Sequence, residues 1–164
     1  MIPIISIVGK SNSGKTTLIE KLIPEFKRRG YRIGTIKHHL HDFEVDQRGK
    51  DSWRHAQAGA DAVAIASPYK LAFITTPPSD LTLDELRDRY FQNVDLVIAE
   101  GYKGSTHPKV EVFRAEVYEC PLFRKGDNLL ATVSDINVDT GVPCFGLEDI
   151  APLVDLLENT FLSS

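Results

Sequence analysis

Residues 9–16 of the chain read Gly9-Lys10-Ser11-Asn12-Ser13-Gly14-Lys15-Thr16. This stretch decides the fold, because it matches G-x-x-x-x-G-K-T, the Walker A pattern of a phosphate-binding loop. An apolar run, Ile2 to Val8, precedes the loop, and an amphipathic helical pattern begins at Lys15. A chance match rarely has a strand before it and a helix after it. The stretch therefore predicts a strand–loop–helix unit that binds phosphate groups.

Each residue type in the loop has a defined role in holding a nucleotide. Gly9 and Gly14 permit backbone angles that a Cβ would forbid, so successive N–H groups can turn inward toward phosphate oxygens. Lys15 is expected to reach the β- and γ-phosphates, and the Thr16 hydroxyl is expected to ligate Mg²⁺. We therefore predict that residues from Gly9 to Thr17 bind a nucleoside di- or triphosphate with Mg²⁺.

Composition is that of an ordinary folded domain. The chain has 164 residues, of which 42% are hydrophobic and 26% are charged, and this length predicts one domain over residues 1–164. A net charge of −4 argues against a general nucleic-acid-binding protein. Met1 to Ile5 lack the basic region of a signal peptide, and no apolar run approaches the roughly 20 residues of a membrane span. We expect a cytoplasmic protein with no membrane or nucleic-acid partner.

The two cysteines, Cys120 and Cys144, do not have the spacing of a zinc site or a redox motif. A disulfide between them stays open from sequence. Reduced thiols are the expected state of a nucleotide-binding protein of the cytoplasm.

Short apolar runs alternate with helical patterns along the chain. Helices are expected over residues 15–29, 51–58, 82–91 and from Asp149 onward, and strands over residues 2–8, 31–37, 62–66, 71–75, 95–101, 110–113, 129–133 and 142–145. This alternation predicts an α/β fold, a three-layer sandwich like that of P-loop NTPases, with a mostly parallel sheet and helices on both faces. Ligands of such folds bind at the carboxyl ends of the strands.

The stretch from Asp95 to Glu100 looks like a Walker B strand, whose acidic residue holds Mg²⁺ or a metal-bound water. Glu100 is at the carboxyl end of this strand, where the phosphates are expected, whereas Asp95 is at the other end. We therefore predict Glu100 as a metal-binding residue and, with Lys15, as a catalytic one. A plain surface carboxylate is the alternative.

The segment from His38 to Lys50 is polar and rich in groups that can bind metals, including His38, His39, His41, Asp42 and Asp46. It could be a transition-metal site, because imidazoles and carboxylates suit Ni²⁺ or Zn²⁺. It could instead be a switch loop that senses the γ-phosphate and Mg²⁺, with Asp46 or Asp42 acting through the metal. A solvated polar loop is the third interpretation, and the switch loop is the one that we favour.

A second carboxylate, Asp135, follows the apolar run from Leu129 to Val133. It could accept hydrogen bonds from N1 and N2 of a guanine base. It could equally cap a turn, which is the usual role of aspartate at such a position.

The sequence resembles the MobB family, the molybdopterin-guanine dinucleotide biosynthesis protein B family, over nearly its whole length. The resemblance rests on the phosphate loop, on Thr35 to Asp46, on Gly49-Lys50-Asp51-Ser52, on Ala58-Gly59-Ala60 and on Asp95 to Lys103. The combination K-H-H-x-H-D-F-x-x-D followed by G-K-D-S is far more specific than the Walker A motif. The stretch from Ala115 to Asn128 matches the family less clearly, and no role follows for it.

The resemblance implies a GTP-binding accessory protein with weak GTPase activity. Such a protein assists a partner guanylyltransferase that attaches GMP to molybdopterin, and it associates as a dimer. It implies that Lys15, Thr16, Asp46 and Glu100 belong to the site for GTP and Mg²⁺. Lys37 and His38 are expected beside that site, because the second strand ends there.

Two other functions share the phosphate loop. A small-molecule kinase would also need a pocket for the phosphate acceptor. Kinases of this size commonly carry an arginine-rich lid, whereas Arg87, Arg89, Arg114 and Arg124 are scattered along the sequence. A metallochaperone GTPase that inserts nickel would use the histidines of residues 38–41. We find no arginine placed to act in cis as an arginine finger, which contributes a factor of about 10³–10⁵ where it operates, so we expect slow hydrolysis.

Overall fold

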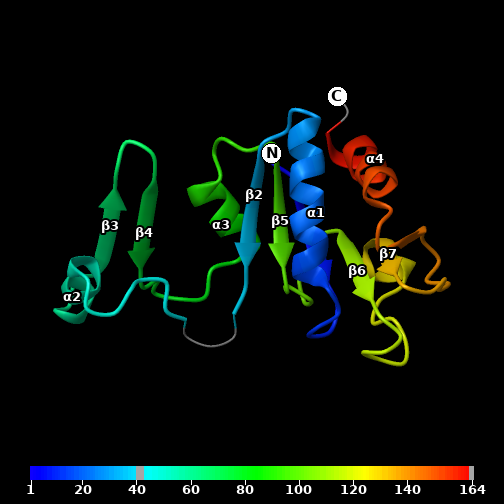
Figure 1. Ribbon diagram of the computed structural model, residues 1–164, viewed down its shortest axis with the longest axis horizontal. Helices are drawn as coiled ribbons and strands as arrows, with labels where there is room; N and C mark the ends of the chain where they lie inside the picture. Colours follow the sequence, from blue (N-terminus) through cyan, green and yellow to red (C-terminus); the bar gives the residue numbers. More distant parts are fainter. Residues whose placement is uncertain (40–42, 163–164) are drawn as a thin grey trace. The chain divides into compact units, whose positions relative to one another are not determined.

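The computed structural model describes residues 1–39 and 43–162. Its elements, in chain order, are β1 (Ile4–Val8), α1 (Lys15–Arg28), β2 (Ile33–Lys37), α2 (Asp51–Gln57), β3 (Ala62–Ala66), β4 (Leu71–Thr75), α3 (Leu83–Tyr90), β5 (Leu96–Glu100), β6 (Lys109–Phe113), a 3-10 turn (Lys125–Asp127), β7 (Leu129–Ser134), β8 (Cys144–Gly146) and α4 (Ile150–Phe161) (Figure 1). The α/β class predicted from the sequence is confirmed.

The chain folds as two compact units. The first comprises Met1–His38 together with Leu83–Ser164, and the second comprises His39–Thr82. The phosphate loop and the strand that ends at Glu100 lie in the first unit, whereas Asp46 lies in the second. One nucleotide-binding domain over residues 1–164 stays a prediction.

The first unit is built on a parallel sheet with the strand order β2-β5-β1-β6-β7-β8. Glu100 at the end of β5 is in register with Ile7 of β1 on one side and with Lys37 of β2 on the other. Because parallel strands end at the same edge, this register brings the ends of β2 and β5 beside the start of the phosphate loop.

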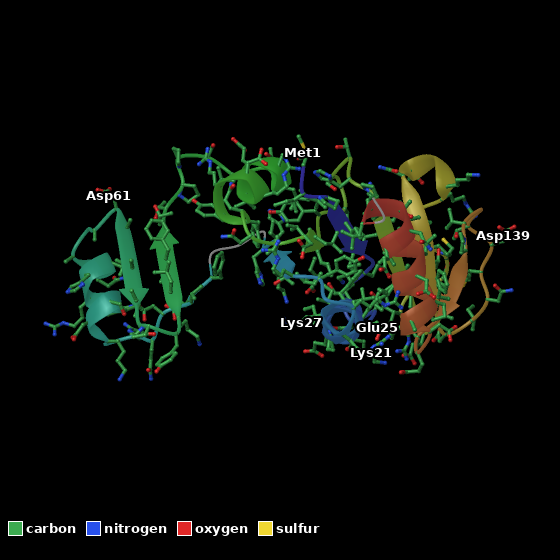
Figure 2. All side chains as sticks on the ribbon, turned by 90° about the horizontal axis from the view of Figure 1, so that it is seen from above. Met1, Lys21, Glu25, Lys27, Asp61 and Asp139 are labelled. Atoms are coloured by element: carbon green, nitrogen blue, oxygen red, sulfur yellow. The ribbon has the colours of Figure 1, made fainter. Side chains whose placement is uncertain are left out.

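Helices α1 and α4 cover one face of this sheet. Leu18, Leu22 and Phe26 of α1 recur at helical spacing and are buried together with Leu153 and Leu157 of α4. In Figure 2 the labelled Lys21 and Glu25 lie on the side of α1 toward α4, and Lys27 lies on the other side. This apolar layer and its polar rim hold the helix that follows the phosphate loop against the sheet.

Ion pairs join the same two helices at their rim. Arg29 pairs with Glu25 at 2.9 Å and with Asp155 and Glu158 at 2.6 Å, and Lys21 pairs with Glu148. Arg29 is itself largely buried, so these contacts are less screened by solvent than ordinary surface pairs.

The opposite face of the sheet is apolar over β2, β5 and β1 and polar over β6 and β7. Its apolar part packs on α3 through Ile4, Ile36, Val97, Ala99 and Leu83. The polar part carries buried Lys109, Glu111, Thr132 and Ser134. Helices therefore cover both faces of the sheet, as predicted. Over β6 and β7, where irregular segments cover the second face, the buried side chains are polar.

Lys109 and Glu111 satisfy the backbone of the irregular segments beside β6. The Lys109 ammonium donates to the carbonyl oxygens of Ser105, His107 and Asp127. The Glu111 carboxylate accepts hydrogen bonds from the amides of Leu122 and Phe123. One strand thus supplies donors to carbonyl groups and acceptors to amide groups, which removes the penalty of leaving buried backbone groups unpaired.

The second unit consists of α2 against an antiparallel hairpin, β3–β4, in which Ala64 is opposite Phe73 and Ala66 is opposite Leu71. Leu71 is 69% exposed and Phe73 is 55% exposed within the chain. These four residues share one side of the hairpin, because strand residues alternate between faces and the register pairs them. We call this set the apolar hairpin face.

Cys120 and Cys144 are free thiols. Among the residues that the structure describes, no helix is both long and apolar enough to cross a membrane.

Candidate functional site

The phosphate loop connects the buried end of β1 to the first turn of α1. Gly9 and Gly14 have φ values of +143° and +98°, and Asn12 adopts the left-handed region at +63°. These positive φ values suit glycine and, less commonly, asparagine. Gly14 is the N-cap of α1, and no side chain caps that end. The first amides of a 14-residue helix are therefore left for an anion, and the helix dipole favours negative charge there.

The ammonium of Lys15 folds back over the loop. It donates to the carbonyl oxygen of Lys10 at 2.7 Å and to that of Gly9 at 3.3 Å. Burial lowers the pKa of Lys15, Glu100 opposes this effect, and the positive charges of Lys103 and Lys37 add to it. Three lysines therefore concentrate positive charge around one carboxylate, and the excess charge favours a polyanion.

Thr16 and Glu100 meet across the gap between α1 and β5. The hydroxyl of Thr16 lies 3.1 Å from Oε1 and 3.2 Å from Oε2 of Glu100, and it donates its proton to the carboxylate. The Lys37 ammonium lies 3.7 Å from Oε1 of Glu100. The structure thus brings together the predicted residues Lys15, Thr16, Lys37 and Glu100 at one edge of the sheet.

Asp95, the other acidic residue of the β5 segment, has a different environment. Arg32 donates to it through its backbone amide at 2.7 Å and through its guanidinium at 2.8 Å. These contacts lower the pKa of Asp95 to about 2. Asp95 precedes the first residue of β5, at the opposite end of the strand from Glu100, and it is an ion-pair partner there.

His38 lies directly after β2, next to Glu100. Its amide donates to the carbonyl oxygen of Glu100 at 3.2 Å, and its ring stacks on Tyr102 with centroids 4.5 Å apart. Gly101 continues this edge with φ +97°, and its amide donates to the carbonyl oxygen of Ile7. The backbone of β1, β2 and β5 therefore holds His38 beside the phosphate loop strand, where the sequence predicted it.

Besides His38, the predicted residues of the 38–50 segment are His39 and Asp46, which belong to the second unit, and two that the structure does not describe. His41 and Asp42 lie outside the described residues. Asp46 belongs to the second unit, and its carboxylate accepts a hydrogen bond from the amide of Gln47 at 2.7 Å. Within residues 1–39 and 43–162, no three histidine, cysteine, aspartate or glutamate side chains are grouped so that they could hold a metal ion.

Asp135 follows β7 and is held by the segment after β6. Its Oδ1 accepts the amide of Ala115 at 3.3 Å, and its Oδ2 lies 3.2 Å from Nε of Arg114. These contacts orient the carboxylate at the edge where the parallel strands end. They are compatible with both predicted roles, because a carboxylate has further lone pairs for an N–H donor.

Glu111 and Tyr118 belong to no motif of the sequence, yet the structure places Tyr118 against the phosphate loop and Glu111 directly behind it. Glu111 is fully buried, and Tyr118 donates to it from the segment that follows β6. One feature of the sequence could have indicated Glu111. Charged and apolar residues alternate in the stretch Lys109-Val110-Glu111-Val112-Phe113, and the structure buries this whole strand. A charge in such a strand indicates a specific buried partner.

Comparison with known proteins gives consistent results for sequence and structure. Residues 4–135 match the profile of the family described as "MobB: Molybdopterin guanine dinucleotide synthesis protein B". The molybdopterin-guanine dinucleotide biosynthesis adapter protein of Haemophilus influenzae is 37% identical over 159 residues, covering 96% of this chain and 89% of the relative. The adapter protein of Escherichia coli is 35% identical over 161 residues, covering 96% and 92%.

Solved structures are similar to this chain over nearly its whole length. The crystal structure of Bacillus subtilis MobB has a TM-score of 0.75 at 31% identity and covers 99% of both chains. A crystal structure of molybdopterin-guanine biosynthesis protein B also has a TM-score of 0.75, at 32% identity, covering 96% of this chain and 99% of its own.

Proposed function

This chain belongs to the MobB family of molybdopterin guanine dinucleotide synthesis proteins, and from that premise we propose that it binds GTP with Mg²⁺ at the phosphate loop. As an adapter protein it then serves the partner guanylyltransferase that attaches GMP to molybdopterin. The observation that carries the nucleotide proposal is the joint placement of Lys15, Thr16 and Glu100 at the carboxyl edge of the sheet.

The side chains of this site fit a magnesium nucleotide. Mg²⁺ prefers hard oxygen ligands and keeps several waters, and the Thr16 hydroxyl and Glu100 carboxylate supply such oxygens. In this proposal Thr16 contacts the metal directly and Glu100 holds it or one of its waters. When bound, the metal would neutralise charge on the phosphates. Asp46, which belongs to the second unit, stays a prediction from the sequence as a metal ligand.

The remaining charges of the site are set to bind phosphate oxygens. The amides at the start of α1 have no side-chain cap, and Lys15, Lys37 and Lys103 provide positive charge beside them. Lys15 would exchange its hydrogen bonds to the loop carbonyls for charge-assisted bonds to phosphate, which are roughly twice as strong as neutral ones. We therefore assign binding of the nucleotide, and not its hydrolysis, as the main role of this site.

We assign at most weak GTPase activity to the protein. No arginine within residues 1–39 and 43–162 forms a hydrogen bond or ion pair with Lys15, Thr16 or Glu100. Such a charge is what stabilises the transition state in faster GTPases. The catalytic roles of Lys15 and Glu100 then amount to positioning the phosphates and the metal.

We also propose that the protein acts as a homodimer. The apolar hairpin face, formed by Ala64, Ala66, Leu71 and Phe73, is exposed within the chain. A two-stranded hairpin is marginally stable alone, and exposed apolar strands favour pairing with another chain. Coverage of this face by a second copy would stabilise the hairpin.

Calorimetric titration with GTP, GDP and ATP, each with Mg²⁺, tests the proposed function. A clear preference for GTP supports it, and equal or tighter binding of ATP would favour a small-molecule kinase. Asp135→Asn is expected to weaken GTP binding about tenfold and leave ATP binding unchanged, because a carboxylate accepts from guanine N1 and N2 and an amide does not replace it. Asp139→Asn, at the exposed position labelled in Figure 2, is the matched control.

A further inference from the structure

A buried tyrosine lies behind the phosphate loop. Tyr118 is 5% exposed, and its ring meets that of Phe113 edge-on with centroids 4.8 Å apart. Its hydroxyl lies 2.7 Å from the carbonyl oxygen of Val112 and 3.0 Å from Oε1 of Glu111. Burial and the negative charge of Glu111 raise the pKa of Tyr118 well above its usual value. The hydroxyl therefore stays protonated and donates between two fixed acceptors.

Glu111 anchors this tyrosine and the segment that carries it. The carboxylate is fully buried in β6 and accepts the amides of Leu122 at 2.7 Å and Phe123 at 3.1 Å besides the hydroxyl of Tyr118. The segment leaves β6 through a tight turn in which the amides of Val117 and Tyr118 donate to the carbonyl oxygen of Arg114. Three donors on one buried carboxylate fix the segment to the strand.

The same groups contact the first residues of the phosphate loop. A Cβ on Gly9 would lie 2.5 Å from the carbonyl oxygen of Val112 and 3.5 Å from the hydroxyl of Tyr118, so the loop backbone runs directly against them. The Lys10 ammonium lies 5.2 Å from the centroid of the Tyr118 ring, within the range of a cation–π contact. The loop thus rests on a surface whose shape depends on Tyr118.

We propose that Tyr118, held by Glu111, is a positioning residue that keeps the start of the phosphate loop in its anion-binding conformation. Its hydroxyl fixes the carbonyl of Val112 against which Gly9 packs, and its ring directs the side chain of Lys10. A loop that is already ordered has less conformational entropy to lose when phosphate binds. The inference rests on the proposed nucleotide site and assigns a role to the segment after β6 in that site.

The substitution Tyr118→Phe removes the hydroxyl and keeps the ring. We expect it to weaken binding of Mg·GTP, Mg·GDP and Mg·tripolyphosphate about three- to tenfold, the effect of losing one buried hydrogen bond. Tripolyphosphate has no base, so its parallel loss places the effect at the phosphate loop. Tyr69→Phe, at a tyrosine that is 96% exposed in the β3–β4 turn, should leave all three affinities unchanged.

Amide hydrogen exchange separates positioning from a merely structural role. Positioning predicts several-fold faster exchange of residues 9–14 in Tyr118→Phe, with unchanged exchange in α4. If the variant fails to fold, Glu111→Gln serves in its place, because it weakens the same anchor and keeps Tyr118. The same weakening of ligand binding and faster loop exchange are expected for it.

Unchanged affinities for all three ligands in the folded variant would overturn the inference. If the wild-type protein binds none of them, the proposed function fails and the exchange measurement decides about Tyr118: faster exchange of residues 9–14 supports its role, and unchanged exchange overturns it.

Discussion

The hydroxyl of Thr16 lies 3.1 Å from Oε1 of Glu100, although 84 residues separate them in the chain. Thr16 is in the first turn of α1, and Glu100 is the last residue of β5. The contact exists because β5 pairs directly with β1, which brings the end of β5 beside the loop that leaves β1. A hydroxyl and a carboxylate, both oxygen groups of the kind that Mg²⁺ prefers, are thereby placed side by side.

Lys15→Ala should reduce GTP affinity at least tenfold, because a hydrogen bond to a charged group contributes about 1.5–3 kcal/mol. The fold should persist, since within the described part of the chain the ammonium donates hydrogen bonds only to loop carbonyls. Calorimetry gives the affinity and thermal unfolding reports the fold. Lys27→Ala, at an exposed position on the same helix, is the control. Wild-type affinity in Lys15→Ala would disprove the phosphate-loop assignment.

Glu100→Gln should remove most of the gain in nucleotide affinity that Mg²⁺ provides and leave metal-free binding nearly unchanged. The reason is that an amide is a poorer ligand for a hard cation or its water than a carboxylate is. Titrations with Mg²⁺ and with a chelator measure the two affinities. Asp95→Asn, on the same strand segment but paired with Arg32, should retain the full Mg²⁺ effect. If both variants respond alike to Mg²⁺, Glu100 has no special role.

Acid should destabilise the first unit through carboxylates whose pKa is depressed in the fold. Arg28 and Arg29 lower the pKa of Glu25 from 4.5 to about 2, and Arg32 lowers that of Asp95 from 3.8 to about 2. A depressed pKa stabilises the fold above the unfolded-state pKa, and this contribution is lost as pH falls through the folded-state value. Denaturant unfolding between pH 5 and pH 2 should show the loss. Glu25→Gln should flatten the slope, and an equally steep slope would contradict the prediction.

Binding of GTP with Mg²⁺ should slow tryptic cleavage after Arg48 and Lys50 if the segment they belong to is a switch. Both side chains are exposed in the chain, so cleavage is expected without ligand. Lys70, exposed in the turn between β3 and β4, provides an internal control in the same unit. Mass spectrometry of timed digests compares the sites. Equal slowing at all three, or at none, would speak against a nucleotide-dependent switch.

Phe73→Glu should convert a dimer to a monomer. The side chain is 55% exposed on the apolar hairpin face, and a charge there would have to be buried in any interface that covers the face. Sedimentation velocity over a range of concentrations measures the association. Tyr90→Glu, at a half-exposed aromatic residue of α3, controls for the added charge. A wild-type monomer at all concentrations would refute the dimer itself.

Local patterns predicted the elements well, and their ends less well. The strand expected over residues 2–8 begins at Ile4, and the strand expected over residues 31–37 begins at Ile33. The helix expected over residues 51–58 begins at Asp51 as predicted and ends at Gln57, and Lys50 before it has the extended backbone of a cap. The first and last residues of a helix or strand depend on hydrogen bonds with neighbouring strands and loops, and these bonds cannot be predicted from local propensity.

Glu100 could be predicted from the sequence as a residue of the site, whereas Glu111 could not. Glu100 follows an apolar strand and precedes a glycine, so its place at the carboxyl edge could be inferred. Glu111 is inside a strand, and its partners Tyr118, Leu122 and Phe123 come from irregular chain that has no period. No sequence pattern indicates which face of β6 is covered by that segment.

The sequence by itself determined the phosphate loop, the alternation of strands and helices and the family, because these depend on residue types at fixed local spacings. Only the tertiary structure decided that Thr16, Lys37 and Glu100 meet, since strand order and register set that contact. It also decided that a buried carboxylate and tyrosine lie behind Gly9. Buried polar groups must find partners wherever the fold brings them, and that pairing is a property of packing in three dimensions.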